Sequence, residues 1–185
     1  VCLHVGEPGG GLSPRAGRLV AALAAAGITT RESDAIGTVV WSKYVGWNAL
    51  MMLAVLTRQR TADYLADPDA ALVIARVTRE MATLAAMRGI PLRDQSPLPA
   101  AAIVNATEAD AVRLVQEVGA TFRQHAPDHR MSSLQDVLRG RPLELEETVG
   151  YALAAGRAAG VAMPVTELCY RLAATVNREL LARRA

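Results

Sequence analysis

Lys43 is the residue with the clearest potential for chemistry. Of the 20 basic residues in this 185-residue chain, 19 are arginine, and Lys43 is the only lysine. It lies in the stretch VVWSKYVGWNALMMLAVLTR, which is apolar on almost every side and predicts a buried helix. Burial lowers the pKa of a lysine and suits it to general acid or base chemistry, whereas an arginine keeps its proton. A coding bias toward arginine, with Lys43 as a paired or snorkelling structural residue, is the alternative interpretation.

A second group of polar side chains lies in the stretch HRMSSLQDVLRGRPLELEETVG, residues 129–150. The S-x-x-Q spacing of Ser132 and Gln135 is typical of a capping box at the start of a helix. Glu144 stands among leucines near the start of the next predicted helix, where the helix dipole favours a carboxylate. These structural roles compete with the alternative that Ser132 and Glu144 belong to a site.

The remaining charged residues are expected to form surface pairs. Asp136 is placed to pair with Arg139 or Arg141. Glu80 lies beside the apolar stripe of its predicted helix, one turn after Arg76, so we expect these two to pair. We assign no chemistry to Asp136 or Glu80.

The sequence offers no metal motif and no dinucleotide fingerprint. His125 and His129 are four residues apart, but no third ligand accompanies them, so we predict no metal site. In the glycine-rich stretch GEPGGG, the pattern G-x-G-x-x-G counted from Gly9 is met at Gly11 but places Pro14 where the last glycine belongs. No G-K-[ST] follows, so the stretch predicts a surface turn.

Composition indicates a soluble globular protein. Hydrophobic residues make up 51% of the chain, the net charge is +2, and aromatic residues make up 4%. This balance gives no sign of a nucleic-acid or membrane surface. Two cysteines, Cys2 and Cys169, are too few for a disulfide framework, and no signal peptide is evident. We therefore expect a cytoplasmic protein.

The predicted elements form a strand, helix, strand unit followed by helices. VCLHVGE and ITTRESD read as strands, and Ser13 as N-cap, Pro14 and Gly27 bound the helix between them. The region around Pro91, Pro97 and Pro99 reads as an irregular connection. Six helices are predicted after the unit, over residues 37–57, 67–89, 107 or 108 to 125, 132–140, 143–159 and 161–184.

Together these motifs resemble the ketopantoate reductases (2-dehydropantoate 2-reductases). The resemblance lies in W-x-K, E-M-x-x-L-A-x-x-R-G-I, S-x-L-Q-D-V-x-x-G-R-x-x-E and G-x-x-A-G-V-x-x-P, between about residues 36 and 170. It implies a mainly α fold, the multi-helix C-terminal domain of the 6-phosphogluconate dehydrogenase-like type, preceded by a βαβ fragment of a Rossmann domain. Residues 1–36 would be that remnant of the NADP-binding domain, and residues 37–185 the helical substrate-binding and catalytic domain.

The resemblance also implies an activity and a set of site residues. Lys43 matches the general acid that protonates the carbonyl oxygen of ketopantoate while NADPH reduces it to pantoate, a step of pantothenate and coenzyme A biosynthesis. Ser132 matches the serine that binds the polar end of the substrate. Glu144 matches the acid at the substrate and cofactor cleft. NADPH would be bound mainly by sequence absent from this chain.

The chain departs from the family at positions that orient the substrate. Where the family has asparagines one and two helical turns after the lysine, this chain has Trp47 and Met51. Asn48 lies one residue off that face and is kept as a candidate for substrate binding. His129 replaces another expected asparagine. A bulkier or more apolar 2-oxo acid is therefore an alternative substrate.

A non-catalytic helical oligomerisation domain is the second alternative. The C-terminal helix carries an apolar stripe that suits either its own core or a partner subunit in a homodimer. The stripe consists of Leu168, Leu172, Val176 and Leu180.

Overall fold

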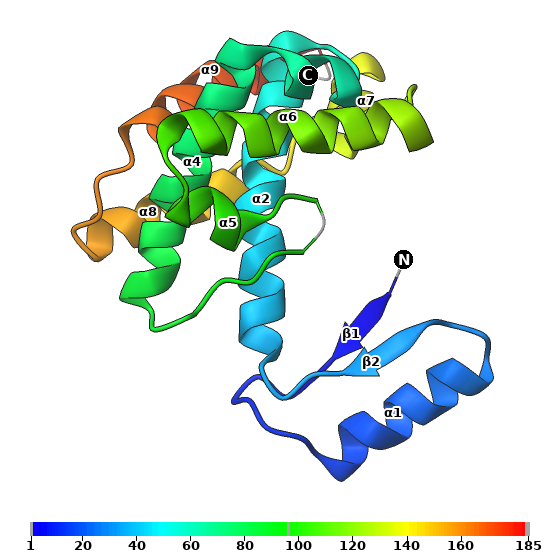
Figure 1. Ribbon diagram of the computed structural model, residues 1–185. Coiled ribbons are helices and arrows are strands. Elements are labelled where there is room, and N and C mark those ends of the chain that lie inside the picture. Colours follow the sequence, from blue (N-terminus) through cyan, green and yellow to red (C-terminus); the bar gives the residue numbers. More distant parts are fainter. Residues whose placement is uncertain (1, 96, 184–185) are drawn as a thin grey trace.

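The computed structural model describes residues 2–95 and 97–183. The outermost ends of the predicted ranges 1–36 and 37–185 lie outside these residues. The chain is mainly α-helical, and one long helix, α2 (Ile36–Thr57), connects a small N-terminal unit to a bundle of helices (Figure 1). This arrangement is the helical fold expected from the sequence.

The N-terminal unit consists of β1 (Leu3–Val5), α1 (Pro14–Ala25) and β2 (Thr30–Glu32). The strands pair in parallel, with Leu3 opposite Thr30. Ser13 caps α1 as predicted, since its hydroxyl accepts a hydrogen bond from the Ala16 amide at 3.2 Å. Gly27 has a φ of +80°, a conformation that glycine adopts readily after a helix. The unit is a βαβ fragment, as the sequence indicated.

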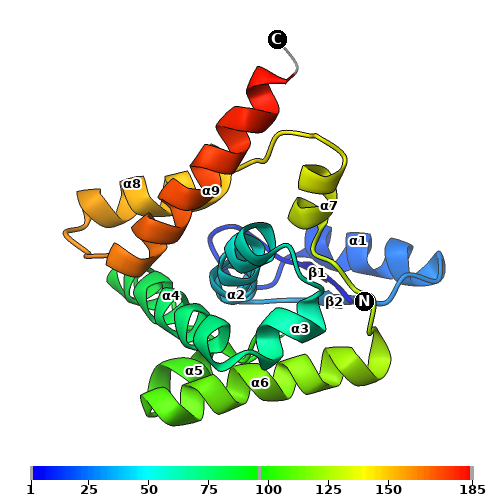
Figure 2. The ribbon, with the colours of Figure 1, turned by 90° about the horizontal axis from the view of Figure 1, so that it is seen from above.

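Helix α2 forms the centre of the bundle, and Figure 2 shows it almost end-on with other helices around it. From Val45 to Val55 nearly all of its side chains are buried, which explains why this stretch is apolar on every side. By length and composition α2 could cross a membrane, but 61% of its most apolar 18-residue window is buried within the protein.

The first turns of α2 extend beyond the bundle toward the strands (Figure 1). Val40 is 56% exposed, and Lys43 is also exposed. The prediction that Lys43 is buried was therefore wrong for this chain. Its apolar neighbours pack against the bundle on one side of the helix only, which leaves the other side open.

Eight α-helices, counting α2, and one π-helical turn follow β2 in the described residues. Those after α2 are α3 (Thr61–Ala66), α4 (Pro68–Met87), α5 (Ala100–Asn105), α6 (Glu108–His125), α7 (Ser132–Leu138), η1 (Glu146–Gly150), α8 (Tyr151–Ala158) and α9 (Pro164–Ala182). The sequence prediction missed α3 and α5. Both have only six residues, and neither begins with a side-chain cap.

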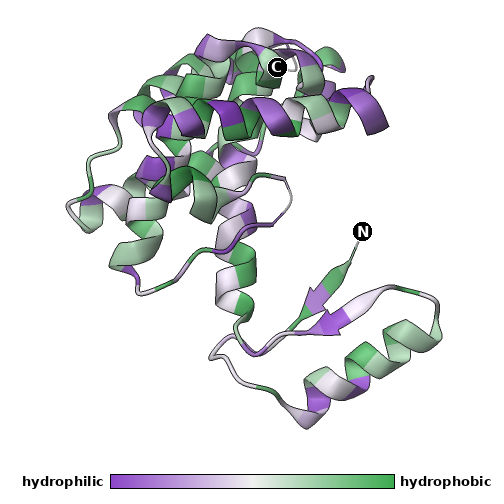
Figure 3. Ribbon diagram, viewed as in Figure 1, coloured by the Kyte–Doolittle hydropathy of each residue, from purple (hydrophilic) through white to green (hydrophobic). Residues whose placement is uncertain are grey.

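Two of the long helices, α4 and α6, begin with a side-chain cap at the predicted start. The Asp67 carboxylate accepts from the Ala70 amide at 2.9 Å, and the Thr107 hydroxyl accepts from the Asp110 amide at 3.1 Å. Along α6, hydrophilic and hydrophobic positions alternate with the helical turn (Figure 3), as expected for a helix that buries one face.

Two predictions about the polar stretch were wrong. The residue that precedes α7 as N-cap is Met131, no side chain caps this helix, and Gln135 donates to the Arg130 carbonyl at 3.0 Å. Ser132 and Gln135 therefore do not form a capping box. The helix predicted from residue 143 begins instead at Glu146, and the Leu143 amide donates a hydrogen bond to Asn177 on α9 at 2.8 Å.

The predicted pair of Glu80 with Arg76 was also wrong. The Glu80 carboxylate accepts hydrogen bonds from the Val165 amide at 2.9 Å and from the Thr166 amide at 2.8 Å, at the start of α9. Arg76 pairs with Glu108 at 2.9 Å. Glu80 thus supplies the cap that α9 lacks within its own sequence.

Candidate functional site

One face of the first half of α2 lines two adjoining pockets. Val40, Lys43, Trp47 and Met51 follow one another at intervals of three or four residues, and Tyr44 lies four residues after Val40 and three before Trp47, so these side chains share one side of the helix. The first four line one pocket, and the last two contribute to the other. Trp47 is common to both and separates them.

The first pocket, which we name the lysine pocket, has a volume of about 410 Å³. It is lined by Val40, Lys43, Tyr44 and Trp47. Lys43 is therefore surrounded mainly by apolar and aromatic side chains although it is open to solvent on one side.

Tyr44 forms a fixed wall of the lysine pocket. Its hydroxyl donates a hydrogen bond to the Thr148 carbonyl at 2.6 Å, and its ring meets those of Trp41 and Tyr151 edge to face, with centroids 5.4 and 6.5 Å away. Burial, and secondarily the nearby Tyr151, raise the pKa of Tyr44 to about 12. The phenol therefore presents its ring to the pocket and keeps its proton.

The second pocket, which we name the polar pocket, has a volume of about 330 Å³. Its walls come from α2, from α7 and from the segment between α7 and η1. They are formed by Trp47, Met51, Ser132, Ser133, Asp136, Arg141, Pro142, Leu143 and Glu144. The structure thus brings Ser132 and Glu144 together in one pocket, and Lys43 lies in the pocket next to it.

Two residues of the polar pocket were not identified from the sequence as site residues. Ser133 is only 7% exposed, and its hydroxyl has no hydrogen-bond partner among the described residues. Arg141 lies 4.0 Å from Asp136, a long ion pair that leaves much of the guanidinium free. An unpaired buried hydroxyl beside an exposed guanidinium suits an anionic ligand such as a carboxylate.

Asn48 and His129 lie outside both pockets. Asn48 is fully buried and donates to the Tyr44 backbone carbonyl at 2.9 Å. The His129 Nδ1 lies 2.8 Å from the Thr61 hydroxyl, and its ring packs on Phe122. We therefore do not include either residue in the candidate site.

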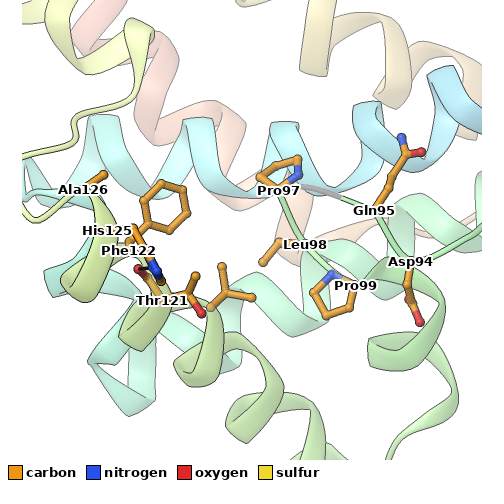
Figure 4. Close-up of a pocket in the computed structure, with 10 residues that line it drawn as sticks. Asp94, Gln95, Pro97, Leu98, Pro99, Thr121, Phe122, His125 and Ala126 are labelled. Atoms are coloured by element: carbon orange, nitrogen blue, oxygen red, sulfur yellow. Dashed lines mark hydrogen bonds between the residues drawn. The ribbon is translucent and has the colours of Figure 1, made fainter. Parts of the chain in front are cut away.

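A larger cavity, of about 540 Å³, lies elsewhere in the part of the chain that the structure describes. Figure 4 shows Thr121 and Phe122 of α6 on one side of it and Pro97, Leu98 and Pro99 on the other. Its lining is mainly apolar and includes neither Lys43 nor the polar residues named above. Size alone therefore does not make it the candidate site.

The glycine-rich turn does not fit the phosphates of a dinucleotide. The Glu7 carboxylate lies in this turn, accepts from Arg15 Nε at 2.7 Å and is also bound by the Ser13 hydroxyl. These contacts, that of Arg15 first, lower the pKa of Glu7 to about 2, so a negative charge occupies the start of α1 where a phosphate would bind. In the part of the chain that the structure covers, no group of three or more His, Cys, Asp or Glu side chains is arranged to hold a metal ion.

Solved structures of similar fold include reductases. The chain matches 2-dehydropantoate 2-reductase from Methylococcus capsulatus with a TM-score of 0.74 and 30% identity, over 97% of this chain and 55% of that one. It matches a D-mandelate dehydrogenase solved with NADH and anilino(oxo)acetate with a TM-score of 0.78 and 20% identity, over 97% and 67%. It matches a dimeric ketopantoate reductase from Staphylococcus aureus with a TM-score of 0.72 and 14% identity, over 97% of this chain and 54% of that one.

The last two identities are low, so these matches show the fold alone. The chain spans about half the length of the Methylococcus reductase and of the Staphylococcus one. Comparison with curated protein sequences gave no significant match. Residues 35–177 match the family described as ketopantoate reductase PanE/ApbA, C terminal. The chain therefore belongs to the ketopantoate reductase family, through the C-terminal domain of that family.

Proposed function

We propose that this chain is the substrate-binding half of an NADPH-dependent reductase that converts a 2-oxo acid to the corresponding 2-hydroxy acid. The observation that supports this proposal is the position of Lys43, the only lysine, in a pocket that adjoins Ser132 and Glu144 across Trp47. A proton donor beside a pocket suited to a carboxylate is the arrangement that carbonyl reduction of a 2-oxo acid requires.

In this proposal each residue has a separate role. Lys43 hydrogen-bonds the carbonyl oxygen and transfers a proton to it as negative charge develops there. Ser132 and Arg141 hold the carboxylate of the substrate. Glu144 accepts a hydrogen bond from a hydroxyl of the bound substrate or cofactor. The nicotinamide supplies the hydride that makes the carbonyl carbon a secondary alcohol.

We propose that NADPH is bound mainly by sequence outside these 185 residues. The turn before α1 carries the Glu7 carboxylate and does not fit a phosphate. Residues 1–36 would then be the end of the nucleotide-binding domain, and residues 37–185 the helical domain. The nucleotide-binding domain would cover the open face of α2 and exclude water from Lys43.

The test is oxidation of NADPH, and in parallel of NADH, by the full-length protein that carries this chain. The 2-oxo acid is varied, and ketopantoate is one member of the panel. We expect Lys43→Arg to lower turnover of every accepted acid by about 10²–10⁴-fold, because arginine keeps the charge and cannot give up its proton.

Arg58→Lys is the control for this substitution. Arg58 ends α2 on the far side of the bundle centre and lines neither pocket. We expect its variant to keep full turnover. Full turnover by the Lys43→Arg variant would exclude Lys43 as the general acid, and a parent protein that reduces no 2-oxo acid would exclude the proposed reaction.

We propose further that the protein forms a homodimer in the cytoplasm. Leu168 and Leu172 of α9 are 61% and 48% exposed, whereas Leu180 is buried. The outer part of the predicted stripe is therefore available to a second copy. Light scattering of the full-length protein and of a Leu168→Gln, Leu172→Gln variant tests this, since an unchanged dimer in the variant would exclude α9 as the interface.

A further inference from the structure

The lysine pocket has few groups that could bind a polar substituent. The described residues that line it include no amide and no carboxylate. Its one hydroxyl, that of Tyr44, is directed to the Thr148 carbonyl. Besides Lys43, a ligand there meets the Val40 side chain and the rings of Tyr44 and Trp47, and none of these described side chains offers a free acceptor to a hydroxyl on that ligand.

The polar pocket offers the opposite environment. Ser133 has a buried hydroxyl without a partner, and the Arg141 guanidinium is held by only one long ion pair. Leaving a buried hydroxyl unpaired is unfavourable, so a carboxylate that accepts from Ser133 and Arg141 would relieve this cost. The two pockets are therefore matched to the two ends of a molecule with one carboxylate and one apolar group.

We infer that the substrate is a 2-oxo acid with a branched or aromatic apolar substituent that carries no hydroxyl. Its substituent lies in the lysine pocket against Tyr44 and Trp47. Its carboxylate lies in the polar pocket on Ser132 and Arg141, as proposed above, and also accepts a hydrogen bond from Ser133, which leaves the carbonyl oxygen beside Lys43. This inference rests on the proposed reduction of a 2-oxo acid and adds the substrate class.

Trp47 is the residue that sets this preference. Trp47 lines both pockets, so its ring contacts any ligand that extends from one pocket into the other. An asparagine at this position would offer an amide to a substituent hydroxyl, whereas an indole ring offers apolar surface and one N–H donor.

Two acids that differ by one hydroxyl give a matched comparison. Ketopantoate is 3,3-dimethyl-2-oxobutanoate with a hydroxyl on one methyl group. We expect the full-length protein to reduce 3,3-dimethyl-2-oxobutanoate with a kcat/KM about 10–100-fold above that of ketopantoate, the range over which an apolar pocket discriminates against an added hydroxyl. Phenylglyoxylate, which has a flat ring as substituent, is expected to exceed ketopantoate as well.

Substitutions at two positions test the orientation. Trp47→Asn is expected to lower the ratio of kcat/KM for 3,3-dimethyl-2-oxobutanoate to kcat/KM for ketopantoate at least tenfold. Trp47→Phe is expected to leave this ratio unchanged. Ser133→Ala is expected to raise KM for all three acids by a similar factor, because it removes a group that contacts the shared carboxylate. If Trp47→Asn proves unstable, Trp47→His provides a polar ring of smaller size at the same place.

A binding measurement separates failure of the inference from failure of the proposed reaction. Phenylglyoxylate is added to the parent protein and to its Trp47→Phe variant, and the quenching of tryptophan fluorescence is measured in both. The difference in quenching between the two proteins reports binding next to Trp47. Preferred reduction of ketopantoate, abolished by Lys43→Arg, would overturn the substrate class and leave the reductase proposal intact. Trp47-dependent binding of phenylglyoxylate without turnover would support the substrate class and overturn the reaction. Neither binding nor turnover of any of the acids would overturn both.

Discussion

The Tyr44 hydroxyl donates a hydrogen bond to the Thr148 carbonyl at 2.6 Å and so joins α2 to the π-helical turn η1. The two residues are 104 positions apart in the sequence. A π-helical turn is uncommon and often occurs next to functional sites. Here it begins two residues after Glu144, so one hydrogen bond links a wall of the lysine pocket to the segment next to the acid of the polar pocket.

Tyr44→Phe should therefore lower stability by about 1 kcal/mol, the typical contribution of one partly buried hydrogen bond. The ring stays in place, so its packing on Trp41 and Tyr151 is retained. Urea denaturation followed by circular dichroism measures the change. A variant as stable as the parent would show that this hydrogen bond contributes nothing net.

Tyr44→Phe should also reduce the decrease in the free energy of unfolding that occurs at alkaline pH. Burial raises the pKa of Tyr44 from 10.0 to about 12, so between these values the unfolded chain binds fewer protons than the folded one. The free energy of unfolding therefore falls as the pH rises from about 10 to about 12. Tyr64 and Cys169, whose pKa values burial also raises, contribute in the same range in both proteins. The difference between the two stability curves isolates Tyr44, and parallel curves would contradict the assignment.

Glu80→Ala should destabilise the bundle by roughly 2–3 kcal/mol. The substitution removes a carboxylate that accepts from two amides and from the Thr166 hydroxyl, which is fully buried, and hydrogen bonds to charged groups contribute more than neutral ones. Glu80→Gln, which keeps one acceptor oxygen, should lose about half as much. Glu108→Ala is the control, because Glu108 makes an exposed pair with Arg76. Equal effects of the Glu80 and Glu108 substitutions would contradict the capping role.

Local signals explain which elements could be predicted from the sequence. Asp67 and Thr107 mark the starts of long helices because a side-chain cap acts within three residues. The cap of α9 comes from Glu80, 85 residues earlier in the chain, and no local pattern reveals it. The short helices α3 and α5 lack both a side-chain cap and enough length for a periodic apolar pattern.

The same distinction applies to the candidate site. Lys43 stands out because it is the only lysine, and Ser132 and Glu144 because they match a family motif. Ser133 carries no such signal, since a serine inside a short helix is an ordinary surface residue. Arg141 is the arginine of the same family motif, but its position next to a glycine predicted only a surface pair with Asp136. The unpaired state of the Ser133 hydroxyl becomes visible only when α7 packs against α2. The spacing of Tyr44 and Trp47 after Lys43 was present in the sequence, but it read as part of a buried apolar helix.

Gly119→Ala should destabilise the protein by about 1–3 kcal/mol. A Cβ atom at this position of α6 would lie 2.9 Å from the Leu65 Cβ and 3.1 Å from the Ala66 amide nitrogen, so α3 and α6 would have to move apart. Gly17→Ala in α1 is the matched control, because its Cβ would have no neighbour nearer than 3.5 Å. That substitution should be neutral or stabilising by up to about 1 kcal/mol. Thermal unfolding of both variants decides the point, and a more stable Gly119→Ala variant would mean that these helices are packed less closely than described.

The 185-residue chain alone should bind NADPH weakly or not at all. The Glu7 carboxylate, paired with Arg15 and bound by the Ser13 hydroxyl, lies at the start of α1 and occupies the place where a phosphate of the dinucleotide would bind. Isothermal titration of the chain with NADPH, with the full-length protein as the positive control, measures the difference. Micromolar binding by the chain alone would show that the N-terminal unit holds the dinucleotide after all.

Arg141→Met should raise KM for a 2-oxo acid by about 10–100-fold in the full-length protein and change kcat much less. The reason is that Arg141 is proposed to bind the carboxylate, which keeps its charge throughout the reaction, so the guanidinium stabilises substrate and transition state alike. Arg139→Met is the control, since Arg139 lies at the end of α7, two residues before Arg141, and lines neither pocket. Steady-state kinetics with the best acid of the panel distinguishes the two variants. If kcat fell and KM stayed constant in Arg141→Met, the guanidinium would act on the developing alkoxide, and the carboxylate would have to bind elsewhere.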